Sequence, residues 1–245
     1  RVVDGRTGEP MPGATVGFGY RDASSRGPET DAQGRVSIES LVPGFRRVRI
    51  IARGCPIMNM RVRVTPGERL DLGDVPLFPS ATLRGRVLDP SGQGVAAQID
   101  VIPARLVQAA RSLDTNRIAS AAADGVFSFG QVESDRVLVL ARHRDWAPAI
   151  LHVDARTAGE IELRLVTGTP VQLPPVPQID GERWFEIRNA YGDPLAFGGI
   201  PTLESVHSRL APGEYVLHVG CEDVVLQSRA FTVGSSPVVL DITVP

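Results

Sequence analysis

Histidine is the side chain in this sequence with the widest choice of chemistry, because it can bind metal ions and transfer protons near neutral pH. The chain has four of them: His143, His152, His207 and His218. None stands in the HExxH or HxxE spacing of a zinc peptidase. His152 with Asp154, and His218 with Cys221 and Glu222, could each supply half a metal site, but neither group has a distant partner. We therefore predict no metal site and no cofactor.

Motifs for nucleophilic catalysis and phosphate binding are also missing. All 26 basic residues are arginine, so a Schiff-base lysine and the lysine of a P-loop are both excluded. The sequence contains no GxSxG elbow and no GxGxxG motif after a strand. A triad assembled from distant Ser, His and Asp residues stays open, since its members need not be neighbours in sequence. We predict that the chain is not an enzyme and has no catalytic residues.

Arginines crowd one stretch of the first third of the chain. Four of them would share one solvent-facing sheet surface if strands 46–52 and 60–65 pair: Arg47, Arg49, Arg61 and Arg63. Guanidinium groups on such a face would attract carboxylate or sulfate groups with bidentate geometry. The alternative is a solvated strand face whose charges discourage edge aggregation. The sequence leaves both interpretations open.

Composition limits the class of protein. The chain has 245 residues, of which 42% are hydrophobic and 22% charged, as in an ordinary folded protein. The net charge of −2 argues against a globally basic nucleic-acid binder, and no apolar run approaches the roughly 20 residues of a membrane helix. Residues 1–80 carry 12 arginines and 9 acidic residues, whereas residues 170–245 carry 4 and 9. A partner for the first third would therefore be acidic, either a polysaccharide or a protein surface.

Apolar and polar residues alternate in several segments, which predicts half-buried strands with one face on a core. The clearest segments are RVSIES (35–40), RRVRII (46–51), MRVRV (60–64) and PVVLDITV (237–244). Strands recur every eight to fifteen residues or so, with Gly, Pro, Asp or Asn between them. This pattern predicts an all-β chain of antiparallel β-sandwiches.

The sequence also repeats itself. RVVDGRTGEPMPGATV at the start is followed by GRVLDPSGQGVAAQIDV and later by EIRNAYGDPLAFGGI. Asp4, Asp89 and Asn189 occupy the equivalent position at the entry to a turn, where their side chains can cap it. An Asp-x-x-Gly or Asp-Gly hairpin recurs in the first two copies, and a Leu-x-Pro-Gly turn before an aromatic residue recurs in the first and third. We expect three tandem sandwiches.

These motifs resemble the carboxypeptidase regulatory-like domain family. The shared pattern is strand, Asp, Gly-rich turn, Pro-Gly-Ala-x-Val, then Thr-Asp-x-x-Gly-x-Val and Leu-x-Pro-Gly-aromatic. The resemblance implies a seven-stranded, transthyretin-like β-sandwich, related to the B-type repeats of collagen adhesins. It also implies an extracytoplasmic location, that is periplasmic, cell-surface or secreted. The third copy is degenerate and is either of the same type or immunoglobulin-like.

The repeats predict the module boundaries. The first sandwich covers 1–79, the second 80–168 and the third 169–245. An insertion at about 104–123 is either a short helix or an irregular loop. The proline-rich stretch 167–178 is expected to be a semi-rigid spacer, or else a last strand and a turn. Val2 and Val3 look like the end of a longer strand, so we expect a longer precursor with further domains upstream.

Two residue types carry smaller expectations. Trp146 and Trp184 either pack at the rim of a core or offer a platform for a sugar ring. Cys55 and Cys221 fall in different predicted modules, so they are either free or joined by a specific contact between modules. Neither residue type indicates a catalytic role.

The function expected from these features is a non-catalytic structural, spacer or adhesion region of a larger bacterial extracytoplasmic protein. The alternative is a binding module for an anionic polysaccharide or an acidic protein partner, centred on Arg47, Arg49, Arg61 and Arg63. No nucleic acid and no membrane-spanning segment is expected.

Overall fold

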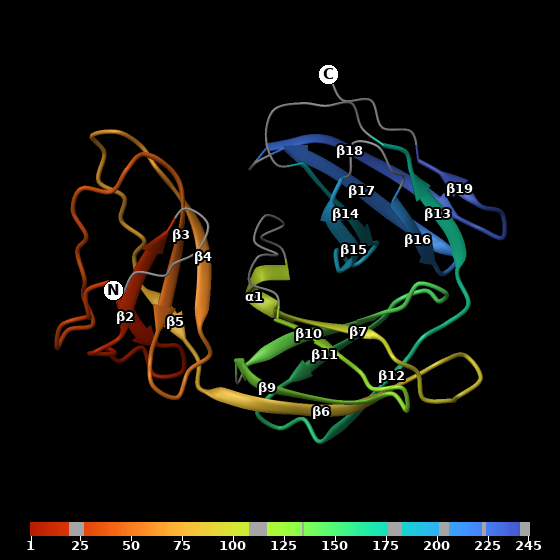
Figure 1. Ribbon diagram of the computed structural model, residues 1–245, viewed down its shortest axis with the longest axis horizontal. Helices are drawn as coiled ribbons and strands as arrows, with labels where there is room; N and C mark the ends of the chain where they lie inside the picture. The colour runs from red at the N-terminus through yellow and green to blue at the C-terminus, as the bar shows by residue number, and fades with distance from the viewer. Residues whose placement is uncertain are drawn as a thin grey trace.

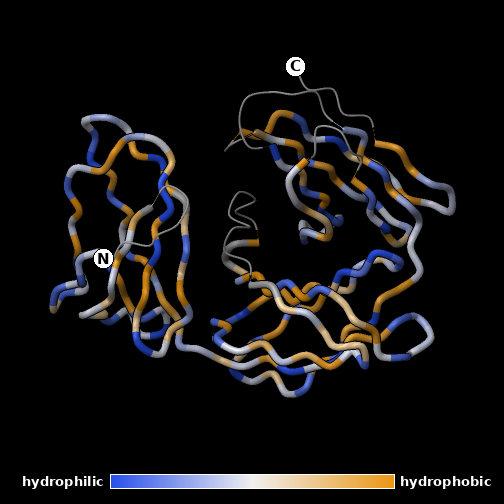
Figure 2. Tube along the Cα trace, in the orientation of Figure 1, coloured by the Kyte–Doolittle hydropathy of each residue, from blue (hydrophilic) through white to orange (hydrophobic). Residues whose placement is uncertain are grey.

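The computed structural model describes residues 1–19, 27–107, 117–133, 135–175, 183–200, 206–221 and 224–240. The strands form small sheets that stack in pairs, with hydrophobic and hydrophilic residues alternating along many strands (Figures 1 and 2). The predicted all-β fold of tandem sandwiches is confirmed. Figure 1 shows the first sandwich beside the second, and the third lying over the second.

The first sandwich has a three-stranded sheet of order β2-β3-β4 and a two-stranded sheet of β1 and β5. Its strands are β1 (Val2–Asp4), β2 (Thr15–Gly19), β3 (Gly44–Ile51), β4 (Met58–Val64) and β5 (Val75–Leu77). Val48 and Ile50 of β3 are buried because alternate residues of this central strand face the core. Residues from both sheets form one apolar cluster.

The second sandwich is larger, with one sheet of order β12-β6-β9 and another of order β11-β10-β7-β8. Its elements are β6 (Ser80–Leu88), β7 (Gln98–Pro103), α1 (Ala104–Val107), β8 (Arg117–Ser120), β9 (Val126–Glu133), β10 (Arg136–Arg142), β11 (Ala149–Asp154) and β12 (Glu160–Arg164). Leu83, Val87, Ile99 and Val139 are fully buried between the sheets.

The third sandwich pairs a sheet of order β16-β13-β19 with one of order β15-β14-β17-β18. Its strands are β13 (Thr169–Leu173), β14 (Arg183–Asn189), β15 (Pro194–Gly199), β16 (Val206–Leu210), β17 (Gly213–Cys221), β18 (Val224–Val233) and β19 (Val238–Val239). Leu173, Ile187 and Leu217 lie at its centre.

Each sandwich also contains one parallel pair, which the alternation of residues did not predict. These pairs are β1 with β5, β6 with β12, and β13 with β19. In each pair the partners stand near opposite ends of the sequence of the sandwich. Two parallel strands must be joined by a long crossover connection, and here the intervening strands form that connection.

The predicted equivalence of the three turns is visible in their hydrogen bonds. Oδ1 of Asp4 accepts the amide of Arg6, and Oδ1 of Asp89 accepts the amide of Ser91, both at 2.8 Å. Oδ1 of Asn189 accepts the amide of Tyr191 at 2.9 Å. The topology after the turn differs, however. β14 and β15 form a hairpin within one sheet, whereas β6 and β7 belong to different sheets.

One expectation needs correction, and two open alternatives are decided in part. Residues 35–40, predicted as a strand, belong to no β-ladder of the described residues. The proline-rich stretch is no spacer over its first part, because Thr169–Leu173 forms β13 and pairs with β16 and β19. The described parts of the insertion are the four-residue helix α1 and the strand β8, which pairs with β7. Residues 108–116 fall outside the described part of the chain.

The second and third sandwiches pack directly against each other. Leu140 of β10 belongs to the same apolar cluster as the core of the third sandwich. Ile102, Val107 and Leu138 form a further cluster, against which Phe197 of β15 packs. Since Val137 and Val139 face the core of the second sandwich, β10 is buried on both faces.

Candidate functional site

The strand register brings the four predicted arginines to one face of the first sandwich. β3 and β4 are antiparallel, with Arg47 opposite Arg61 and Phe45 opposite Arg63. Arg49 lies two residues beyond Arg47 on the same strand and faces Asn59. Because alternate residues share a face, these positions all lie opposite the buried face that carries Val48. The positions of the predicted face are therefore correct.

The side chains are less open to solvent than the sequence suggested. Arg47 and Arg49 are half-buried, and Nε of Arg49 is buried without a hydrogen-bond partner. The guanidinium carbon of Arg63 lies 5.9 Å from the centre of the Phe45 ring, which is within range of a cation–π contact. The side chain of Arg61 is outside the described part. The face offers guanidinium groups to an anion mainly at its exposed Arg63 end.

A second charged cluster lies between the second and third sandwiches. Arg142 donates to both carboxylate oxygens of the fully buried Asp100, with N–O distances of 2.9 and 3.1 Å. The same guanidinium lies 4.4 Å from the ring centre of Phe197. His152 Nε2 is 2.9 Å from Asp193 Oδ1 in the third sandwich. The Arg142–Phe197 contact and the His152–Asp193 hydrogen bond join the two sandwiches, whereas the Arg142–Asp100 pair lies within the second sandwich.

A third ion pair is buried in the same region. Arg188 binds both carboxylate oxygens of Glu186, at 2.9 and 3.0 Å, and donates to the carbonyl of Gly192 at 2.7 Å. Burial raises the pKa of the Glu186 carboxyl, while Arg188 opposes that shift. Sequence reasoning missed both Asp100 and Glu186. The available signal was one acidic residue among apolar neighbours, in QIDVI and in WFEI.

The histidines occupy structural positions. Nδ1 of His218 lies 2.8 Å from the hydroxyl of Ser228, and burial together with the charge of Arg188 lowers the pKa of His218. His207 stands opposite Gln172 in the β13–β16 pair. His143 Nδ1 accepts the amide of Asp145 at 3.1 Å. No group of three or more potential metal ligands occurs within the described residues.

The tryptophans pack against protein. Trp146 lies against the core of the second sandwich. Trp184 covers Gly220, where an added Cβ would lie 2.2 Å from the indole ring. Both rings are half-buried. Cys55 and Cys221 form no disulfide. Burial is the main cause of the raised pKa of the Cys55 thiol.

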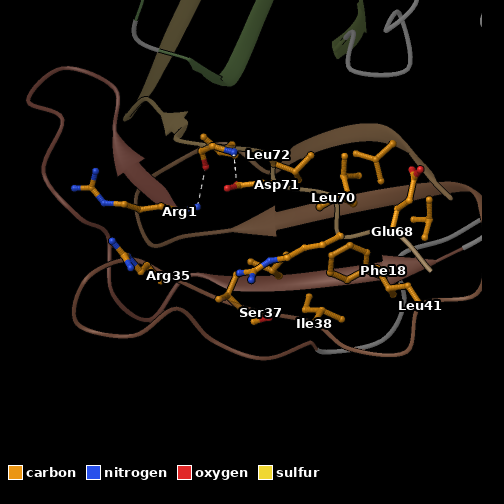
Figure 3. A pocket seen from close by; sticks show the side chains of 18 of the residues that line it. Arg1, Phe18, Arg35, Ser37, Ile38, Leu41, Glu68, Leu70, Asp71 and Leu72 are labelled. Carbon is orange, nitrogen blue, oxygen red and sulfur yellow. Dashed lines mark hydrogen bonds between the residues drawn. The ribbon is translucent and has the colours of Figure 1, made fainter. Parts of the chain in front are cut away.

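A cavity with a volume of about 830 Å³ lies in the first sandwich. Its floor is the apolar face of the β2-β3-β4 sheet, including Phe18. One rim is formed by residues 36–41 and the other by residues 68–74 (Figure 3). Ile38 and Leu41 face Leu70 and Leu72 across the opening. Apolar side chains line much of this groove, and Arg35, Glu68, Arg69 and Asp71 also line it.

None of the helices in the described part of the chain is long and apolar enough to cross a membrane. No protein-family profile matches the sequence, and no curated protein matches it. The resemblance to the carboxypeptidase regulatory-like family therefore stays a prediction.

Several solved structures show limited similarity. The Bacillus anthracis TIE protein aligns with 98% of this chain at 13% identity and a TM-score of 0.29, and the chain spans about half of its length (49%). A streptococcal ancillary pilin aligns with 82% of this chain and 75% of its own, at 12% identity and a TM-score of 0.30. BcpA, the major pilin subunit of Bacillus cereus, aligns with 98% and 97%, at 10% identity and a TM-score of 0.24. With TM-scores this low, none of these similarities decides the function of the chain.

Proposed function

We propose that the chain is a structural region that holds other parts of a larger extracytoplasmic protein at a set distance, built from three modules at 1–79, 80–168 and 169–245. The observation that carries this proposal is the docking of the second sandwich onto the third. A spacer needs stiff joints, and this joint combines apolar packing by Leu140 with the contact of Arg142 on Phe197. The extracytoplasmic location rests on the sequence resemblance alone.

The physical basis of the stiffness is the cost of opening the joint. Separating the two sandwiches would expose Ile102, Leu138 and Phe197 to water, at roughly 25 cal/mol for each Å² of apolar surface. It would also remove the cation–π contact between Arg142 and Phe197. Interfaces between domains that are large and apolar restrict relative motion.

Distances between spin labels test this proposal. In a Cys55→Ser/Cys221→Ser background, labels at Ser128→Cys and Ser236→Cys sit on exposed positions of the second and third sandwiches. A single narrow distance distribution is expected. Adding Phe197→Ala and Arg142→Ala should broaden it. A broad distribution before those substitutions would show a loose joint and contradict the spacer proposal.

The second candidate is binding of an anionic polysaccharide or an acidic protein partner through the arginine face. The pairing of Arg47 with Arg61, flanked by Arg49 and Arg63, supports it. Retention on heparin should fall with added salt, because charge contacts are screened. Changing all four arginines to Ser should abolish it.

A matched control removes the same number of positive charges from the second sandwich instead of the first. Four exposed arginines there can be changed to Ser: Arg84, Arg86, Arg136 and Arg164. Retention should be largely kept in this variant. Equal loss in both variants would indicate nonspecific charge, and retention that survives the first variant would place binding elsewhere.

A further inference from the structure

The groove of the first sandwich has a counterpart in the second sandwich, and there it is filled. Val2 donates to the carbonyl of Gly34 at 2.7 Å, as Val87 donates to the carbonyl of Gly125 at 2.8 Å. Arg1-Val2-Val3-Asp4 thus matches Arg86-Val87-Leu88-Asp89. In the second sandwich, the residues before Arg86 continue as β6.

The β6 residues Ser80–Gly85 have a strand neighbour along one side, and Arg84 and Gly85 also have one on the other side. The strand pairs antiparallel with β9, where Leu83 stands opposite Phe129. On the other side β6 pairs in parallel with β12, where Gly85 stands opposite Ile161. In the first sandwich, residues 36–41 occupy the position that β9 has in the second. Residues 70–73 lie directly before β5, at the position of the start of β12.

The rim at 36–41 keeps the backbone shape of β9 although it pairs with no strand in the described structure. Ser40 has φ of 60°, and Gln131 of β9 has φ of 57°. Both stand six residues after the equivalent glycines Gly34 and Gly125. A left-handed residue is uncommon outside glycine, and at Gln131 it coincides with the irregular register between β6 and β9. The rim is therefore shaped for a strand neighbour.

The rim at residues 70–73 could also pair with an added strand. The parallel β1–β5 ladder extends to Arg1, whose amino nitrogen donates to the carbonyl of Gly73 at 2.9 Å, as Figure 3 shows. Beyond this bond, Leu70 and Leu72 are 50% and 39% exposed. Their side chains and those across the groove would be covered by one added strand.

We propose that this groove binds one further β-strand, which lies between residues 36–41 and 70–73. The strand runs in line with β1 and is joined to the amino group of Arg1. The occupant is about six residues of polypeptide, roughly 20 Å when extended. It has an apolar side chain at the position that faces Ile38, as Leu83 faces Phe129. The mixed charges at the groove ends, including the Arg1–Asp74 pair at 3.0 Å, do not favour a strongly charged ligand.

A grafted strand tests the proposal. The variant carries Ser-Ala-Thr-Leu-Arg-Gly, the sequence of Ser80–Gly85, joined before Arg1. The control carries Ser-Ala-Thr-Arg-Leu-Gly, which places leucine on the opposite face of the strand at the same composition. Amide hydrogen exchange at residues 36–41 should slow by about tenfold or more in the graft and not in the control. Ile38→Asn in the grafted chain should remove the gain.

Other outcomes would overturn the proposal. Equal exchange in graft and control would show that the groove does not select a strand in this register. Protection at residues 36–41 in the ungrafted chain that rises with protein concentration would indicate a second copy as the occupant. Slowed exchange throughout the first sandwich in both extended chains would indicate a nonspecific effect of added length.

Discussion

The first and second sandwiches share their turns but differ in how far they are closed. Asp31 and Gly34 form the same turn as Ala122 and Gly125, with a 2.9 Å bond from the glycine amide in each. The second sandwich places β6 beside the segment that follows this turn, whereas the first leaves a groove there. Local sequence is therefore enough to determine the turn, whereas the segment after it forms a β-strand only where an adjacent strand pairs with it.

The largest expected difference comes from truncating equivalent side chains. Phe129→Ala removes a ring that is buried in the core of the second sandwich and should destabilise it by about 3–5 kcal/mol. Ile38→Ala at the matching position of the half-open groove should cost only about 1 kcal/mol. Hydrogen exchange at increasing urea concentration measures both. Equal costs would mean that the first sandwich is as closed as the second.

Arg142→Ala tests the ion pair that links β7 and β10 inside the second sandwich. It leaves Asp100 buried without its main partner, which should cost about 3 kcal/mol. Trp146 and Trp184 both lie in the docked sandwiches, so urea unfolding followed by their fluorescence reports this loss. The double variant Asp100→Leu/Arg142→Leu should lose much less, because no unpaired charge remains. Similar losses in both variants would show that the unpaired charge of Asp100 does not cause the loss of stability.

A smaller difference in stability is expected at the two residues with a left-handed backbone, Gln131 and Ser40. Gln131→Gly relieves the strain of a positive φ within a paired strand, so it should stabilise the second sandwich by about 0.5–1 kcal/mol. Ser40→Gly should yield less, because its segment lacks a strand neighbour. Urea unfolding compares the two substitutions. A larger gain at Ser40 would indicate that residues 36–41 are held as firmly as β9.

The smallest expected effect is on pH dependence. Because burial raises the pKa of Glu186, the folded third sandwich binds more protons than the unfolded chain just above the ordinary pKa of 4.5. Its stability should therefore fall as pH rises through that range. Glu186→Gln should flatten the tryptophan-monitored unfolding profile there. An unchanged profile would assign the dependence to another group.

Alternation and turn chemistry predicted the all-β fold, the equivalence of Asp4 with Asp89, and the shared face of Arg47 and Arg61. They failed at residues 35–40, where Val36 and Ile38 alternate correctly. Alternation records which side chains face a core and carries no information on whether a neighbouring strand is present. For residues 169–173 alternation left a spacer and a strand open, and the structure has a strand with partners on both sides despite Pro170.

For the candidate sites too, sequence patterns predicted positions along strands but not the contacts made by packing. The arginine positions followed from strand period alone, but their partial burial did not. The Asp100–Arg142 pair joins adjacent strands, and its role between sandwiches depends on Phe197 of another module. Such contacts depend on how modules dock, which no local pattern encodes.

The most direct test of the account compares amide exchange in two equivalent segments of the unmodified chain. Residues 127–132 lie in β9 between a strand neighbour and a packed core, and residues 36–41 occupy the same position without that neighbour. The account predicts that amides of 127–132 exchange at least about a hundredfold more slowly than those of 36–41. Comparable protection in both segments would contradict it.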